Sequence, residues 1–424
     1  MTRSWTLLFC SLVISTATVE CADWPAFRGP HGDGVSHDTG FPVEWSADKN
    51  VKWRTPLPGP GNGSPIVVGD RVFVLCAEDQ GQKRSTLCFD RKTGQELWRK
   101  TVAFHKVEMT HKDNPYCPST PASDGQRIYV WHRSAGMYCY DLNGNQIWSR
   151  ELGEFDHIWG GGSSPLLYKD LVIQLCGPGE RTFLIALNRT DGDTVWETPI
   201  ETGGSSGESS RYVGTWATPV LTEIDGKDRL ICPYHVRTVT YDPASGKELS
   251  TMLGLHREKS DLCYASPVIG NGIAAIQGGF SGPAFAYRLG GTGDTTSTHR
   301  LWRSDEEKNP QRIGSGIILD GYLYFANADG PGSLECLNLE TGEQTWELRR
   351  SEDGPHWASL ILADGKLYAT GQKGFTVFEA DPQEFKQIAT NSLGEHCNAT
   401  PAFSDGELFI RTWDAIYCIA ESAK

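Results

Sequence analysis

The residues best suited to chemistry recur at one position, four residues before the Pro of a Ser/Thr-Pro dipeptide or its equivalent. These eight residues are Gly61, Cys117, Gly161, Thr215, Cys263, Arg312, His356 and Cys397. The planar guanidinium of Arg312 suits a carboxylate or phosphate. The imidazole and thiol groups are types that bind soft or borderline metals, although we expect no metal here.

We predict a ligand-binding site around this column. Its proposed members are Arg312, His356, Trp357, His396, Cys397, Cys117, Cys263 and Trp216. The alternative is that these side chains belong to separate repeats and never converge. Neither a Ser-His-Asp arrangement nor a pair of catalytic carboxylates can be argued from the spacing, so the sequence favours a binding protein over an enzyme.

The 424-residue chain has 53 acidic and 39 basic residues, which give a formal net charge of −14. This balance argues against nucleic acid as a partner, because phosphate binding needs a concentrated basic face. The chain also has 47 glycines and 14 tryptophans but only four methionines. Such a composition suits short strands joined by tight turns.

Residues 1–22 are typical of a secretory signal peptide: Arg3 precedes a largely apolar run, and small residues follow it. The alternative is a membrane anchor, but an apolar run of about 13 residues is too short to span a bilayer. Cys21 follows a poor lipobox, so we do not expect lipidation. We predict a periplasmic or secreted protein without a transmembrane span.

A repeat of 41 to 56 residues organises the rest of the chain. The typical copy has a Ser/Thr start, an apolar strand, an Asp-Gly-like turn, further strands, a Thr-Gly-like turn and a Trp. The copies begin at Ser64, Thr120, Ser164, Thr218, Ser266, Ser315, Ser359 and Thr400. In the fourth copy we place Leu249 at the Trp position. These large apolar side chains are expected to pack between neighbouring sheets.

The eighth copy ends before its Trp strand, and residues 50–54 supply a matching segment that contains Trp53. We therefore predict an all-β, eight-bladed β-propeller over residues 50–424, with the last blade closed by the N-terminal strand. Residues 23–49 form a Gly/Pro-rich arm expected to lie across the propeller. The alternative architecture is an open solenoid.

Two features of this architecture concern reactive side chains. Cysteines 76, 88, 139, 176, 232, 336 and 418 occupy equivalent positions in different copies, so we expect buried small apolar residues rather than disulfides. Eight of the eleven histidines fall in loops that a propeller places on one face. The aromatic residues Tyr116, Trp159, Tyr212, Trp216, Tyr264 and Trp357 fall in the same loops.

The repeat resembles that of pyrroloquinoline-quinone (PQQ) propellers, most closely in the segments ALNRTDGDTVW and CLNLETGEQTW. Residues 23–30, DWPAFRGP, also look like the start of exported PQQ-repeat-like bacterial proteins. The resemblance covers residues 23–424 and implies the eight-bladed fold. It says less about activity, because one fold hosts many functions.

Two kinds of relative imply different functions. PQQ-dependent dehydrogenases oxidise alcohols or sugars with PQQ and Ca²⁺, and this is our alternative hypothesis. The chain lacks the vicinal Cys-Cys pair that those enzymes often contain. BamB-like assembly proteins have the same repeat, a similar length and no cofactor. We favour a monomeric binding or protein-interaction scaffold that needs no cofactor and holds an unidentified protein or small-molecule ligand on one face.

Overall fold

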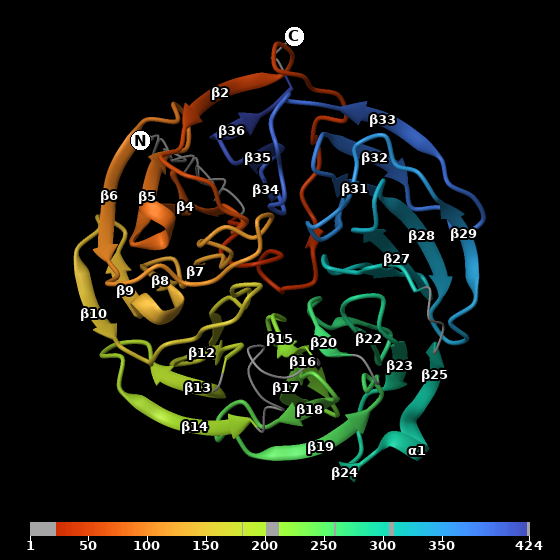
Figure 1. Ribbon diagram of the computed structural model, residues 1–424. Coiled ribbons are helices and arrows are strands. Elements are labelled where there is room, and N and C mark those ends of the chain that lie inside the picture. Colours follow the sequence, from red (N-terminus) through yellow and green to blue (C-terminus); the bar gives the residue numbers. More distant parts are fainter. Residues whose placement is uncertain (1–22, 180, 201–211, 258–259, 305–308, 422–424) are drawn as a thin grey trace, which may run out of the picture.

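Eight four-stranded blades surround a common axis in the computed structural model, which describes residues 23–179, 181–200, 212–257, 260–304 and 309–421. Figure 1 shows the chain passing once around the ring, from red at the N-terminus to blue at the C-terminus. The eight-bladed propeller prediction is therefore confirmed. The predicted signal peptide lies outside the described residues.

Each blade is an antiparallel meander numbered from the inside outward. Blades 1 to 4 comprise β3 (Ile66–Val68), β4 (Arg71–Glu78), β5 (Lys83–Asp90) and β6 (Glu96–Ala103); β7 (Ala122–Ser123), β8 (Arg127–Trp131), β9 (Met137–Asp141) and β10 (Gln146–Arg150); β11 (Leu166–Tyr168), β12 (Leu171–Cys176), β13 (Thr182–Asn188) and β14 (Thr194–Ile200); and β16 (Val220–Ile224), β17 (Lys227–Pro233), β18 (Arg237–Tyr241) and β19 (Glu248–Leu253).

Blades 5 to 8 comprise β21 (Val268–Gly270), β22 (Ile273–Gln277), β23 (Ala284–Arg288) and β25 (Arg300–Ser304); β26 (Ile317–Leu319), β27 (Tyr322–Asn327), β28 (Ser333–Asn338) and β29 (Gln344–Leu348); β30 (Ile361–Ala363), β31 (Lys366–Thr370), β32 (Phe375–Glu379) and β33 (Gln387–Asn391); and β34 (Ala402–Ser404), β35 (Glu407–Arg411), β36 (Ala415–Ile419) and β2 (Val51–Pro56). The remaining elements are β1 (Val35–Ser36), β15 (Tyr212–Thr215), β20 (Ser260–Cys263), β24 (Gly293–Asp294), η1 (Asp79–Gly81), η2 (Arg133–Ala135) and α1 (Thr296–His299).

The position of a strand within its blade determines its hydrophobic pattern. The middle strands β4 and β5 are buried almost throughout, because neighbouring blades cover both of their faces. The outer strand β6 alternates between exposed and partly buried residues. The short apolar runs of the sequence are therefore middle strands, and the alternating segments form the rim.

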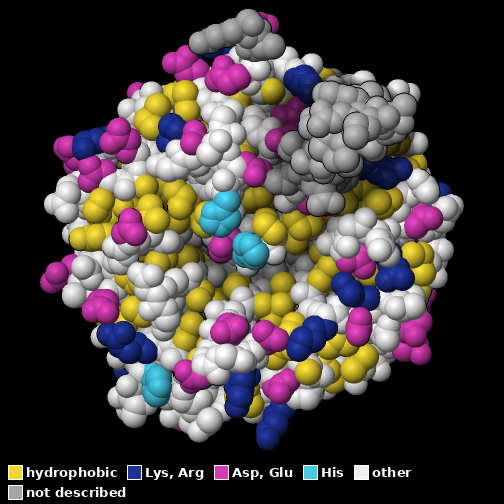
Figure 2. All heavy atoms as spheres, turned by 180° about the vertical axis from the view of Figure 1, so that it is seen from behind, with side chains coloured by type: hydrophobic (Ala, Val, Ile, Leu, Met, Phe, Trp, Pro, Cys, Tyr) yellow, Lys and Arg dark blue, Asp and Glu magenta, His cyan; other side chains and the backbone are white. Residues whose placement is uncertain are grey.

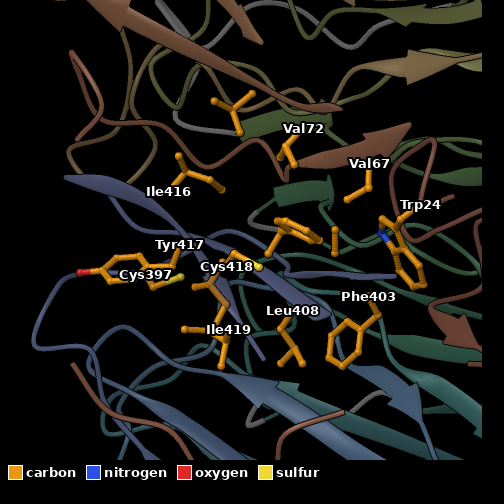
Figure 3. Packing of buried hydrophobic residues seen from close by; sticks show 14 of the residues in the cluster. Trp24, Val67, Val72, Cys397, Phe403, Leu408, Ile416, Tyr417, Cys418 and Ile419 are labelled. Atoms are coloured by element: carbon orange, nitrogen blue, oxygen red, sulfur yellow. The ribbon is translucent and has the colours of Figure 1, made fainter. Parts of the chain in front are cut away.

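The N-terminal strand closes the ring. β2 pairs antiparallel with β36, and Trp53 lies opposite Cys418. This confirms the predicted shared blade. Figure 3 shows the core at this closure, where Trp24 of the arm lies beside Val67 of blade 1 and Phe403 of blade 8. One apolar cluster thus joins the first blade, the last blade and the arm.

Each Trp of the repeat docks on the next blade, as predicted. The Nε1 of Trp53 donates to the carbonyl of Arg91 at 2.8 Å, and its ring lies against Gly94. Gly94 has a φ of +71°, and a Cβ there would meet the indole at 2.5 Å. The same Trp-to-Gly packing recurs in the pairs Trp98/Gly144, Trp148/Gly192, Trp196/Gly246 and Trp302/Gly342.

The fourth blade differs from our prediction, because Leu249 does not occupy the Trp position. In blade 3, Trp196 lies opposite Ala186 on the neighbouring strand. In blade 4, the matching Thr240 lies opposite Ser250. Each outer strand has a one-residue bulge after the turn, and counting from the turn residues misplaced the register by one.

All ten cysteines among the described residues are buried and free. Burial raises the pKa of their thiols, to about 12 for Cys88 and Cys139. This confirms that the repeated cysteines are small apolar core residues.

The arm crosses one face of the ring and passes near its middle (Figure 1). Its strand β1 pairs parallel with β30 of blade 7. Arg28 is fully buried, donates to the carbonyl of Gly316 at 2.7 Å, and has a pKa that burial lowers to about 10. The arm is thus an integral part of the propeller structure.

The molecular surface mixes charges of both signs. On the face shown in Figure 2, acidic and basic side chains alternate around the perimeter, and hydrophobic side chains gather toward the middle. Among the described helices, none is long and apolar enough to cross a membrane.

Candidate binding site at the channel mouth

A ring of hydroxyl groups surrounds the axis where the inner strands begin. The backbone N–H of Ser64 donates to Oγ1 of Thr120 on the next blade at 2.9 Å, and Thr120 donates in the same way to Ser164 at 3.0 Å. The series continues at 2.9 or 3.0 Å through Thr218, Ser266, Ser315, Ser359 and Thr400. In seven of these eight residues, from Thr120 to Thr400, the side-chain hydroxyl oxygen is therefore the acceptor that joins neighbouring blades.

These eight hydroxyl residues, which we call the hydroxyl ring, line an axial cavity of about 440 Å³. Phe27 of the arm lines the same cavity. It also lines a second cavity of about 350 Å³ enclosed by the arm and the inner strands. Phe27, Thr218 and Ser266 therefore border both spaces, and the loops that precede the inner strands form the mouth of the axial cavity.

An aromatic wall forms one side of the mouth. Trp159 lies 5.9 Å from Trp216, and Trp216 lies 5.2 Å from Tyr264, measured between ring centroids. Phe280 stacks on Trp159 at 6.2 Å. All four residues line the cavity, and they come from the loops of blades 3, 4 and 5.

A short parallel sheet holds this wall together. β15 precedes Trp216, β20 precedes Tyr264, and the two strands pair residue by residue. The N–H of Trp216 then donates to the carbonyl of Cys263 at 2.9 Å, and its indole Nε1 donates to the carbonyl of Gly160 at 2.9 Å. Backbone pairing and the indole hydrogen bond therefore fix the ring orientations.

Residues 104–119, which we call the mouth loop, reach across the opening from blade 1. The ring of His111 stacks on Trp357 of blade 7 with centroids 5.8 Å apart. The carbonyl of Asp113 accepts hydrogen bonds from the side-chain amides of Asn62 and Asn398, at 2.8 and 3.1 Å. The side-chain amide of Asn114 in the same loop donates to the carbonyl of Trp159 at 2.8 Å, so the loop is tied to the aromatic wall as well as to blades 7 and 8.

A buried ionic cluster anchors the root of the mouth loop. Glu108 accepts hydrogen bonds from Arg84 and Ser134, and Nη1 of Arg133 lies 3.8 Å from its carboxylate. The charged side chains are at most 3% exposed. Arg84 also donates to the carbonyl of Gly81 at 2.9 Å. The buried charges of Glu108, Arg84 and Arg133 are therefore paired within this cluster, as burial of charged groups requires.

Five uncharged amides add to the polar lining that the hydroxyl ring provides. Asn62, Asn114, Asn398, Gln311 and Gln372 line the cavity, and Asp113 is the only carboxylate among its lining residues. Asn398 is 4% exposed, and its Oδ1 has no hydrogen-bond partner. Since its Nδ2 donates to Asp113, the network assigns Oδ1 as an unpaired acceptor.

Two of the eight predicted site residues, Trp216 and Trp357, line the cavity. Arg312 is buried and does not line the cavity. Its guanidinium contacts the carboxylate of Glu335 at 2.6 and 2.8 Å and covers the ring of Phe325. Glu335 also accepts a hydrogen bond from Asn327 at 3.1 Å. The structure therefore gives Arg312 an internal carboxylate partner.

His356 is also enclosed. It is fully buried, and its Nε2 lies 3.4 Å from the carboxylate of Asp353. Burial lowers the pKa of His356 and raises that of Asp353. Thr376 donates to Asp353 at 2.9 Å. Both groups are held inside blade 7, next to the cavity wall that Trp357 forms.

The other four predicted residues do not line the cavity. The ring of His396 lies 4.0 Å from that of Trp413. The thiols of Cys263 and Cys397 donate to backbone carbonyls at 3.4 and 3.1 Å, and Cys117 is buried. Their participation in ligand binding stays a prediction, as it does for Arg312 and His356.

Sequence reasoning missed the polar lining and Phe280. Asn62 stands out in the sequence only as part of a glycosylation pattern, and nothing singles out Gln372 or Phe280. The signal that was available is the Ser/Thr at each repeat start, which marks the hydroxyl ring. A Ser or Thr recurs there in all eight copies, and in seven of them its hydroxyl oxygen accepts the hydrogen bond that joins neighbouring blades.

Comparisons with known proteins place this geometry in a family. A family model described as outer membrane protein assembly factor BamB matches residues 35–103 and 82–348. BamB of Burkholderia pseudomallei (strain K96243) is 22% identical over 361 residues, which cover 73% of this chain and 82% of that protein.

Solved structures show the same fold. BamB from Moraxella catarrhalis superposes with a TM-score of 0.59 at 14% identity, covering 87% of this chain and 99% of that one. The quinohemoprotein alcohol dehydrogenase from Comamonas testosteroni superposes with a TM-score of 0.66 at 11% identity, covering 95% and 81%. Because these identities are low, the two likenesses concern architecture alone.

Proposed function

Because the chain belongs to the outer membrane protein assembly factor BamB family, we propose that it is an exported, periplasmic scaffold that binds a protein of the outer membrane assembly machinery. The observation that carries this proposal is the family match across residues 35–348, which runs through most of the propeller. A closed ring is a rigid platform, and its variable loops and rim can present binding surfaces without catalysis.

An apolar belt on the rim offers the protein-binding surface. Leu97, Ile147 and Val195 precede the docking Trp on the outer strands of blades 1, 2 and 3, and each is 44–51% exposed. Nothing in the blades requires an aliphatic residue here, since blade 6 has Thr345 at the same position. The repetition places one exposed aliphatic side chain on the rim of each of three successive blades.

The rim can also accept an added strand. The outer strand β19 of blade 4 pairs in parallel with β24, a segment of this chain inserted in blade 5. Among the described residues, no strand pairs with the outer edges of β6, β10 and β14. A partner segment with alternating apolar residues would find both backbone hydrogen bonds and the apolar belt there.

The test compares matched charge substitutions on the rim. The triple variant Leu97→Glu/Ile147→Glu/Val195→Glu should lose photo-crosslinking to the assembly machinery and fail to restore outer membrane β-barrel protein levels in a deletion strain. Each buried aliphatic side chain is worth roughly 1.5–3 kcal/mol, so the loss should be severe. The control Thr345→Glu adds charge at the same position of blade 6 and should behave as wild type. Normal crosslinking and barrel protein levels in the triple variant would refute this surface.

The alternative is PQQ- and Ca²⁺-dependent oxidation of alcohols or sugars. The donor set of the axial cavity does not fit these groups. Its lining contains one carboxylate for a calcium ion, and neither Arg nor Lys to pair with the carboxylates of PQQ. We therefore propose that the scaffold works without PQQ. Dye-linked oxidation that depends on added PQQ and Ca²⁺ would overturn this part of the proposal.

A further inference from the structure

The axial cavity has the form of a small-molecule site, which an assembly scaffold does not need. Its volume of about 440 Å³ falls in the ~300–1,000 Å³ range of ligand pockets. Phe27 of the arm contributes to its lining. We propose that it binds a neutral carbohydrate, with sugar rings held between the aromatic wall and the amides of the mouth loop side.

Aromatic faces on two sides suit a flat, amphipathic ring. Trp159 and Trp357 stand in the loops before blades 3 and 7, which lie four blades apart in a ring of eight and so on opposite sides of the axis. Tyr264 and Phe280 extend the wall beside Trp159. The C–H face of a pyranose packs on such rings, while its hydroxyl groups point outward.

The polar groups of the cavity match hydroxyl groups. The side-chain amides of Gln311 and Gln372 line the space, and each offers both a donor and an acceptor. The unpaired Oδ1 of Asn398 is an acceptor that lacks a donor. Each Oγ of the hydroxyl ring from Thr120 to Thr400 accepts one amide N–H, which leaves its own proton to donate into the cavity.

The charge of the lining determines the ligand class. No Arg or Lys lines the cavity, so a phosphate or carboxylate would lose its hydration without gaining a cation. Asp113, the one acid, lies 3.3 Å from Nζ of Lys112, which offsets its charge. A small cation such as choline would use the aromatic rings but leave the amides unpaired. A neutral polyol satisfies both sets of groups.

The test is titration calorimetry of the full-length mature protein with maltotriose, cellotriose, chitotriose, mannotriose and lactose, alongside choline and 3′-sialyllactose. We expect saturable binding of at least one neutral sugar. Trp159→Ala and Gln372→Ala should each weaken that binding by about tenfold or more. The control Tyr168→Ala removes a partly buried ring on β11, outside the lining, and should leave binding unchanged.

Three results would overturn the inference: no neutral sugar binds at 10 mM, choline or sialyllactose binds in place of neutral sugars, or Trp159→Ala and Gln372→Ala bind sugar as the wild type does. The outcome is independent of the proposed scaffold function. Sugar binding uses the cavity, whereas crosslinking to the assembly machinery uses the rim, so either can fail alone.

Discussion

The mouth loop depends on one buried carboxylate, and removing its charge should release the loop. Glu108→Gln keeps the shape of the side chain but replaces a carboxylate oxygen with an NH₂ group that cannot accept a hydrogen bond. Arg84 and Arg133 would then be buried without a counter-charge. Breaking a buried ion pair on one side costs about 3–5 kcal/mol of stability.

We expect Glu108→Gln to cost an amount of stability at the lower end of that ~3–5 kcal/mol range, which is about 3 kcal/mol. Arg84 keeps its hydrogen bonds to the carbonyls of Gly81 and His132, which still stabilise its charge. Part of this loss in the free energy of unfolding should be local: backbone amides of residues 105–117 should exchange with deuterium faster than in the wild type, because the loop has lost its anchor.

A matched control and a double variant test this anchoring role. Glu154→Gln removes an exposed carboxylate that pairs with Lys106 at 2.6 Å at the edge of the same loop, and it should leave unfolding unchanged. Combining Glu108→Gln with Arg84→Met should cost less than the sum of the single changes, by about 1 kcal/mol or more. Denaturant unfolding and hydrogen exchange measure both effects. Wild-type stability and wild-type loop exchange in Glu108→Gln would refute the anchoring role.

Two further predictions follow from the glycines and the buried histidines. Gly94→Ala should destabilise the protein by about 2 kcal/mol more than Gly125→Ala, because both have positive φ but only Gly94 faces a Trp ring; equal denaturation midpoints would contradict the docking role. Burial lowers the pKa of His132 to about 3 and of His157 to about 4. The unfolded chain therefore binds protons first as pH falls below about 6.5, and stability present above that pH should decline by about 2 kcal/mol per histidine at pH 5. The double variant His132→Gln/His157→Gln should flatten this decline in denaturant unfolding; an unchanged slope would show that other groups cause it.

The fold was predictable because each blade repeats the same local requirements. Asp90 and Gly94 form the turn, and Trp53 then needs that glycine to dock. Such contacts link each repeat to the next one along the chain, so the pattern can be read directly from the sequence. We predicted the register of blade 4 wrongly because Ser250 occupies the position of the Trp that would have marked the bulge. A repeat without its landmark residue gives no sign of a one-residue shift.

The site was less predictable because it is built where the repeats differ. Column counting selected the backbone positions of Arg312 and His356, but a backbone position does not specify where a side chain points. Both groups turn into their own blades because Glu335 and Asp353 offer them buried carboxylates there. The cavity is shaped instead by loops that differ between blades, among them residues 104–119 and the loops that carry the aromatic wall. The contacts of residues 104–119 reach blades 7 and 8, far away along the chain, and no local pattern encodes contacts of that kind. We therefore expect a ligand of this propeller to contact the loops that differ between blades, whereas its stability depends on the strands that repeat.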